Sequence, residues 1–201
     1  MIKKIVNVII FVFIFALYAV SFMFLFETFR QRKLETIEAN ALDTFDNSVK
    51  VEEKTIEEVQ NDNTYDGGIS YDDYTILGVI EIPAIGFKSV IIQENTYRAM
   101  SVGVIKSYGV GLNEPGGTVI SGHNFRGRSL FMYNIKDLEP GDVIYITDAS
   151  GRKVSYTVYE KLRHVDPGDT TIYNHFDGFH ISLITCEDPG TSRIVVKAHA
   201  E

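Results

Sequence analysis

One uncharged apolar stretch constrains the fold of this chain more than any other feature. Residues 5–26 include no charged side chain, and only Asn7, Tyr18 and Ser21 interrupt their apolar character. At 1.5 Å per residue, a helix of this length crosses a hydrocarbon core of about 30 Å. No later stretch is comparably apolar. We therefore expect one transmembrane helix, with short flanks, within residues 1–33.

The same stretch also has features of a cleaved signal peptide, because Ala19 and Ser21 have the spacing of a cleavage site. We favour an uncleaved anchor, since the apolar run continues through Phe26 and exceeds a usual signal core. Two lysines precede the run, and Glu27 and three basic residues follow it. The positive-inside rule therefore gives no clear orientation.

Residues 34–75 form an acidic segment. They carry twelve Asp or Glu residues and two Lys, a net charge of −10, whereas the whole chain carries −8. The acidic balance therefore belongs to this segment, and the rest of the chain is near +2. High charge with few aromatic residues favours a flexible linker, although Val51, Ile56 and Val59 show some helical periodicity. A lid over a binding cleft is the alternative role.

Residues 76–201 are long enough to bury one hydrophobic core. Short apolar runs separated by Gly- and Pro-containing turns predict a mainly β domain, either an antiparallel sandwich or a closed barrel. We expect strands at 76–82, 88–93, 118–122, 143–147, 153–162, 180–186 and 193–199, and short helices at 97–102 and 129–135.

Cys186 is the only cysteine of the chain. It ends an apolar run just before a turn, and Arg193 opens the next predicted strand. If the two runs form a hairpin, Cys186 and Arg193 face each other with Cβ atoms about 5 Å apart. His123 ends another apolar run far upstream. A thiol, an imidazole and a guanidinium are the minimal set for a thiol nucleophile with an oxyanion donor.

Each of these three residues also has a purely structural interpretation. Free cysteines are often buried and inert, and a lone Arg or His is more often an ordinary surface or half-buried residue. The N-terminal anchor favours the functional interpretation of Cys186, because an unpaired thiol in an oxidising compartment is exposed to oxidation without a disulfide in return. The remaining histidines share no spacing and are expected to be structural: His164, His175, His180 and His199.

Four sequence pieces occur in an order that resembles the sortase family. They are Gly78-Val-Ile-Glu-Ile-Pro83, Thr118-Val-Ile-Ser-Gly-His-Asn124, Leu138-Glu-Pro-Gly-Asp142 and Leu183-Ile-Thr-Cys186, and Arg193 follows at a strand start. The resemblance covers about residues 78–198. Sortases are membrane-anchored transpeptidases of Gram-positive bacteria. The resemblance implies a closed eight-stranded β-barrel with short helices over residues 76–201, behind one N-terminal transmembrane helix.

The resemblance also implies roles for individual residues. Cys186 corresponds to the nucleophile, His123 to the general acid/base and Arg193 to the residue that stabilises the oxyanion and substrate. Ser121 and Thr185 are expected to line the cleft, and the loop from Val165 to Phe179 is expected to contact the substrate. No cofactor or metal is expected. A calcium site like that of some class A enzymes stays open as an alternative, although its candidate ligands Glu114, Asp166 and Asp169 are equally well explained as ordinary loop acids.

The implied substrate is a secreted protein with an LPXTG-like C-terminal sorting signal, cleaved through a thioacyl enzyme. An amine of a peptidoglycan precursor or of a pilin subunit then accepts the acyl group. The enzyme is expected at the cell membrane, single-pass, with its catalytic domain outside the cell and without a nucleic-acid partner.

Departures from the family patterns favour a class A- or D-like enzyme over class B or C. Class C enzymes usually carry a lid with an Asp-Pro motif, and residues 34–75 contain no proline. Class B enzymes usually insert a long helix before the strand that carries the cysteine, and here only about fifteen residues, 165–179, lie in that position. Two alternative functions remain. The first is an L,D-transpeptidase, but such enzymes usually have His-Gly shortly before the cysteine, and this chain lacks it. The second is a non-catalytic extracellular binding barrel of sortase ancestry.

Overall fold

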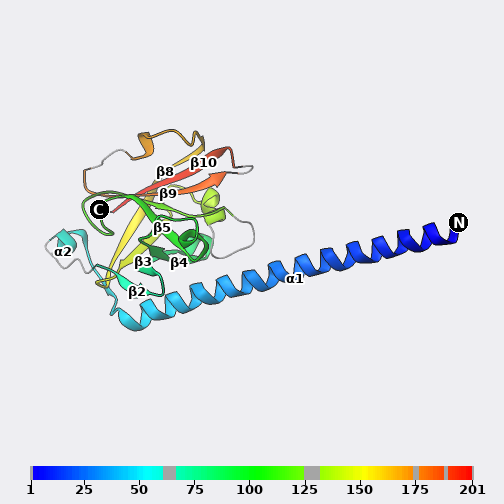
Figure 1. Ribbon diagram of the computed structural model, residues 1–201. Helices are drawn as coiled ribbons and strands as arrows, with labels where there is room; N and C mark the ends of the chain where they lie inside the picture. The colour runs from blue at the N-terminus through cyan, green and yellow to red at the C-terminus, as the bar shows by residue number, and fades with distance from the viewer. Residues whose placement is uncertain (1, 61–66, 125–131, 174–176, 188–189, 201) are drawn as a thin grey trace. The chain divides into compact units, whose positions relative to one another are not determined.

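The computed structural model describes residues 2–60, 67–124, 132–173, 177–187 and 190–200. The chain forms two compact units, Met1–Ile37 and Glu38–Glu201, and each is described by itself. Helix α1 (Ile2–Ser48) contributes to both units, and every other described element belongs to the second one (Figure 1).

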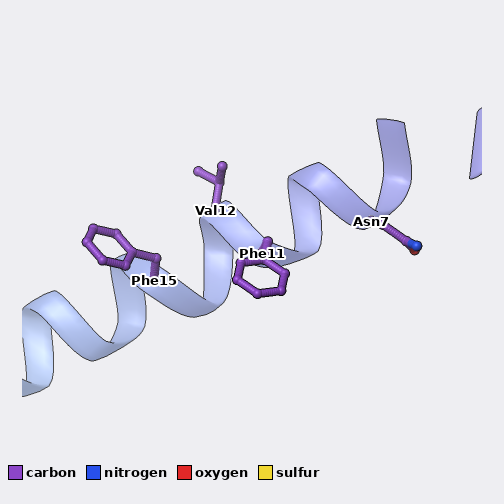
Figure 2. Close-up of a pocket in the computed structure, with 4 residues that line it drawn as sticks. All are labelled: Asn7, Phe11, Val12 and Phe15. Atoms are coloured by element: carbon purple, nitrogen blue, oxygen red, sulfur yellow. The ribbon is translucent and has the colours of Figure 1, made fainter. Parts of the chain in front are cut away.

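The first unit is the apolar part of α1. Its large apolar side chains are mostly exposed, and the helix is long and apolar enough to cross a membrane by its length and composition. Asn7, Phe11, Val12 and Phe15 surround a shallow hollow of about 510 Å³, and Figure 2 shows their side chains projecting away from the helix axis. Such a surface is what a membrane-spanning helix exposes to lipid.

The second unit is built on a closed ring of eight strands. In order around the ring these are β3 (Tyr74–Ile82), β4 (Phe87–Ile92), β5 (Val104–Gly109), β6 (Gly116–Ser121), β9 (Phe179–Glu187), β10 (Ser192–Ala200), β8 (Arg152–Val165) and β7 (Val143–Asp148). Strand β7 pairs with β3 and closes the ring. Two further strands flank it: β1 (Glu52–Glu53) pairs with β8, and β2 (Ile69–Tyr71) pairs with β3. The predicted closed eight-stranded barrel is confirmed.

Short helices connect the strands. They are α2 (Ile56–Gln60) and the 3-10 helices η1 (Pro83–Ile85), η2 (Ala99–Ser101), η3 (Met132–Asp137) and η4 (Thr171–Tyr173). Helix η2 lies within the predicted helix at 97–102. The predicted helix at 129–135 begins among residues that are not described, and η3 is its described part.

Side-chain alternation along the strands places apolar clusters on opposite faces of the sheet. The barrel interior holds the larger one, which includes Ile120 of β6, Leu183 of β9 and Val196 of β10. The neighbouring positions on the same strands point the other way. There Val119, Ile184 and Val195, together with Ile172 of η4, form a separate buried cluster. We call these four residues the outer-face cluster.

The acidic segment 34–75 departs from the flexible linker that its composition predicts. Helix α1 continues through Ser48, and its residues Ala41 and Phe45 are at most 1 % exposed. Val59 of α2 belongs to the interior cluster of the barrel. Helix α2 begins at a capping box, in which Thr55 and Glu58 exchange side-chain-to-backbone hydrogen bonds of 2.8 and 3.4 Å. In the described part of this segment, residues 34–60 and 67–75, a few well-spaced apolar residues are therefore buried despite its charge.

A buried polar network fixes the turn that leads into β6. Asn113 lies in the left-handed region (φ 55°), and its Nδ2 donates to the Arg152 carbonyl at 2.8 Å. Its Oδ1 accepts from the Tyr156 hydroxyl at 3.1 Å. Arg152 itself is 2 % exposed and pairs with Asp148 at 2.7 Å and with Glu114 at 3.2 Å. Because the buried charges are paired, this network holds the start of β6 against the β7–β8 hairpin.

Candidate active site

The carboxyl ends of β6 and β9 meet at one edge of the barrel. The two strands are parallel neighbours, with Ser121 opposite Ile184. The backbone N–H of Gly122 continues this ladder and donates to the Ile184 carbonyl at 3.1 Å. His123 comes directly after Gly122, just beyond the end of β6, and Cys186 lies two residues beyond Ile184 along β9. Parallel pairing therefore brings together two residues that lie far apart in the sequence.

Strand β10 adds Arg193 to the same edge. It pairs with β9 in the register that sets Arg193 opposite Cys186, as the spacing of the two residues predicts. Both residues alternate with positions that point into the barrel, so they share a face with the outer-face cluster. A guanidinium directly opposite a thiol can reach an oxygen bonded to the carbon that the thiol attacks.

The loop after β8 covers the outer-face cluster. Ile172 of η4, 5 % exposed, packs in that cluster, and Leu162 and Val165 at the end of β8 pack against it. Val165 and Ile172 belong to the loop from Val165 to Phe179, which is expected to contact substrate. Residues 174–176 of this loop lie outside the described residues. A peptide approaching Cys186 along this face must pass this loop or displace it.

The two residues expected to line the cleft differ in their positions. Ser121 is half-buried on the outer side of β6, and its hydroxyl shares a hydrogen bond of 2.7 Å with that of Ser107. Thr185, in contrast, is 2 % exposed, and its hydroxyl donates to the Gly122 carbonyl at 2.9 Å. Thr185 therefore joins β9 to β6 beside His123, and its hydroxyl is directed away from the outer face.

Tyr97 packs against the His123 ring, with the ring centroids 4.7 Å apart and the planes inclined at 62°. Burial lowers the pKa of His123 below its ordinary value of 6.5, and a hydrogen bond to the backbone of Tyr97 partly offsets that effect. The imidazole is therefore neutral near pH 7 and held in one orientation. Nothing in the sequence indicates this contact, because Tyr97 lies in a turn far upstream of His123.

Asn124 and Glu187, which follow His123 and Cys186 in the sequence, also make side-chain hydrogen bonds. Asn124, next to His123, donates from Nδ2 to the backbone carbonyl of Cys186 in a short hydrogen bond. This bond joins the ends of β6 and β9 directly beside the thiol. Only adjacency to His123 could have drawn attention to Asn124 in the sequence.

Glu187, next to Cys186, is 4 % exposed and holds β8, β9 and β10 together. It accepts hydrogen bonds from Arg163 Nε at 2.8 Å, from the His164 backbone N–H at 2.8 Å and from the Ser192 hydroxyl at 3.1 Å. Burial alone would raise the pKa of Glu187, but these hydrogen bonds outweigh it and lower the pKa below 4.5. The carboxylate thus fixes the strand end that carries the thiol.

Among the described residues, no group of three or more His, Cys, Asp or Glu side chains could hold a metal ion. The acids considered for calcium make local contacts. Glu114 pairs with Arg152, Asp166 accepts from the Gly168 N–H at 2.7 Å, and Asp169 accepts from the Thr171 N–H at 2.8 Å.

Comparison with known proteins identifies a family. Residues 80–201 match the family model of the sortase domain. No curated protein sequence matches the chain significantly. Among solved structures, a lid mutant of sortase A from Corynebacterium diphtheriae is 28% identical, covering 63% of this chain and 70% of that chain, with a TM-score of 0.57.

Two further structures share the fold at lower identity. A sortase D5 transpeptidase from Clostridium perfringens is 22% identical, covering 82% of this chain and 96% of that chain, with a TM-score of 0.59. A pilus-related sortase C of Group B Streptococcus is 24% identical, covering 69% of this chain and 75% of that chain, with a TM-score of 0.57. Because these structures represent several classes, they leave the class of this chain open.

Proposed function

Because this chain belongs to the sortase family, we propose that it is a cysteine transpeptidase that cleaves an LPXTG-like sorting signal and joins the released protein to an amine. The acceptor is an amine of the cell wall or of a pilin. Helix α1 anchors the enzyme in the cell membrane, with the barrel outside the cell.

One observation carries this proposal. Cys186 and Arg193 face each other in the β9–β10 ladder, and His123 follows the end of β6, the parallel neighbour of β9, so the three residues meet at one edge of the barrel. A structural cysteine would need neither an imidazole on the adjacent parallel strand nor a guanidinium directly opposite. The combination instead matches the needs of acyl transfer, namely a nucleophile, a proton carrier and an oxyanion donor.

The first half-reaction forms a thioester. The Cys186 thiol gives its proton to the neutral imidazole of His123 and attacks, as a thiolate, the carbonyl carbon of the threonine in the signal. The guanidinium of Arg193 donates hydrogen bonds to the resulting oxyanion. The carbon–nitrogen bond to the next residue then breaks. His123, as imidazolium, gives its proton to the departing amine and becomes neutral. The burial of His123 against Tyr97 makes that proton easy to release.

The second half-reaction reverses these roles. A neutral acceptor amine attacks the thioester carbon, His123 takes the proton that the amine loses, and the Cys186 thiolate departs. A new amide bond replaces the carbon–sulfur bond. Water at the same position gives hydrolysis, so the amine must reach the thioester ahead of water.

The test uses the full chain in detergent micelles with a library of LPXTG-like peptides and mixed amine acceptors. We expect mass spectrometry to show cleavage after threonine, ligation to an amine and an acyl adduct on Cys186. The Cys186→Ala variant should fold and form no adduct. Turnover by that variant would rule out Cys186 as the nucleophile. A native chain that neither cleaves any peptide nor labels at Cys186 with a thiol-reactive analogue would support a non-catalytic binding barrel instead.

A further inference from the structure

A second, polar pocket of about 350 Å³ lies on the other side of the strand ends that carry the candidate catalytic residues. Its walls include Asn124, Glu187 and Ile194, which are the chain neighbours of His123, Cys186 and Arg193. Glu187 and Ile194 are strand residues, and successive residues of a strand point to opposite faces, so their side chains face away from those of Cys186 and Arg193. The pocket therefore lies behind the thiol, whereas the outer-face cluster lies in front of it. We call it the rear pocket.

The rear pocket contains charges of both signs. Helix η3 contributes Lys136 and Asp137, whose side chains pair at 2.8 Å. Arg163 of β8 contributes a guanidinium that pairs with Glu187. Two cations and two carboxylates give no net charge, so the pocket favours neither a simple anion nor a simple cation. It suits a ligand that carries both an amine and a carboxylate.

The cations are held where a ligand carboxylate could meet them. Lys136 Nζ lies over the ring of Tyr133, another wall residue, at 4.3 Å from its centroid, which limits the side chain's freedom. Arg163 uses its Nε and Nη2 groups on one oxygen of Glu187. A guanidinium has five N–H donors, so others remain for a ligand.

Asn124 supplies the complementary acceptor. Its Nδ2 is engaged with the Cys186 carbonyl, and within the described part of the chain its buried Oδ1 has no hydrogen-bond partner. A neutral amine has N–H groups to donate and one lone pair for attack. Donation to Asn124 Oδ1 would hold the amine beside Cys186 and leave its lone pair available for the thioester.

We propose that the rear pocket binds the acceptor of the transfer reaction, an amine on an amino-acid residue that also bears a carboxylate. The proposal rests on the transpeptidase function proposed above. The acyl chain then lies on the outer face of β9 and the acceptor carboxylate lies in the rear pocket. The amine, held at Asn124 where the ends of β6 and β9 meet, reaches the thioester round the end of the strand without displacing the acyl chain. The amine nitrogen bonds to the thioester carbon, the carbon–sulfur bond breaks, and the amine proton passes to His123.

The binding test uses the full-length Cys186→Ala chain in detergent micelles, so that no reaction can occur. The probes are Nα-acetyl-L-lysine, which has a free carboxylate, and Nα-acetyl-L-lysine amide, which lacks one. Saturation-transfer NMR should show about tenfold weaker binding of the amide, as expected for one lost charge-assisted hydrogen bond. Adding Lys136→Met should weaken binding of the acid about tenfold and remove the difference between the probes.

Lys153→Met is the matched control. Lys153 Nζ also lies over a tyrosine, Tyr145, at 4.5 Å, and its side chain is 26 % exposed compared with 27 % for Lys136. It pairs with Glu81 on another part of the barrel and should leave binding of both probes unchanged. Equal binding of the two probes, no binding of either, or equal effects of the two Met substitutions would overturn the proposal.

A kinetic test separates this proposal from the proposed function. In the native background, Lys136→Met should raise the KM for Nα-acetyl-L-lysine about tenfold, and the effect should fall on the acceptor rather than on formation of the Cys186 thioester. If no peptide acylates Cys186, the transpeptidase function fails, and the NMR result still decides whether the pocket binds the probe. If acylation is normal and the acceptor KM does not change, the pocket assignment fails.

Discussion

At the scale of single residues, a different contact places each side chain of the candidate site. The hairpin register sets Arg193 opposite Cys186. The ring and backbone of Tyr97 hold His123, and Asn124 holds the carbonyl of Cys186. The roles of Arg193 and His123 can therefore be tested independently, because their supports are not shared.

Arg193→Ala should lower kcat/KM for peptide cleavage by about 10²–10³, the usual cost of one oxyanion donor. Arg193→Lys should recover little of this loss, because an ammonium cannot reproduce the planar guanidinium. Steady-state kinetics on a peptide that the native chain cleaves would measure both. Near-normal turnover by the Lys variant would mean that Arg193 contributes charge alone, and near-normal turnover by the Ala variant would remove it from the site.

Tyr97→Ala should raise the pKa of His123 toward 6.5, because it removes the burying ring and keeps the backbone hydrogen bond. NMR titration of the His123 imidazole would measure the shift, and the pH at which activity changes should move the same way. Tyr145→Ala, on β7 opposite Glu81, should leave the titration unchanged. A downward shift in the Tyr97 variant would contradict burial as the cause.

At the scale of elements, the site depends on β6 and β9 being parallel neighbours. The alternating apolar runs predicted both strands, and the spacing of Cys186 and Arg193 predicted the β9–β10 register. The adjacency of β6 and β9 came only from the family resemblance, because residue spacing carries no information on which distant strands pair. Strand β5 was missed, since its run Val104-Ile-Lys-Ser-Tyr-Gly109 has few apolar residues and lies between glycines.

Glu187→Gln tests how the end of β9 is held. Its pKa lies below 4.5 in the folded chain. Its stabilising effect should therefore be present above about pH 4.5 and lost as the pH falls through the lowered pKa. In urea unfolding at pH 7, we expect Glu187→Gln to lower the free energy of unfolding by about 1–3 kcal/mol, the range for hydrogen bonds to a charged group. The stability of the variant should also depend less on pH in the acid range. Glu139→Gln is the control, because Glu139 is 70 % exposed and should cost less than about 1 kcal/mol. Equal losses of unfolding free energy in the two variants would contradict the conclusion that Glu187 holds the end of β9.

At the scale of the whole molecule, the folded body extends further toward the N-terminus than the sequence indicated. Net charge dominated the interpretation of residues 34–75, and the buried residues Ala41, Phe45 and Val59 were too sparse to outweigh it. Their burial depends on contacts with the rest of the unit, which periodicity cannot show. Among the described residues of this segment, β1 pairs with the first two residues of β8. Arg193 pairs with Val165, the last residue of β8, so β1 and the candidate site lie at opposite ends of that strand. That placement favours a structural role over a lid.

A chain that starts at Asp72 should therefore be less stable than one that starts at Ile37. Burial of Phe45 and Val59 contributes about 1.5–3 kcal/mol each, and the shorter chain also loses β1 and β2. Urea midpoints of the two truncated forms would measure the difference. Equal midpoints, with activity retained by the shorter form, would restore the description of residues 34–75 as a mere spacer.

The hydrogen bond between Asn124 and Cys186 spans 62 residues of sequence, and the parallel pairing around it governs how the protein folds. Pairing between strands so distant closes a long loop, which slows folding relative to hairpins. Because the chain has one cysteine, the slow closing step involves no intramolecular disulfide exchange, and refolding should proceed equally well with or without a reductant that keeps the thiol free.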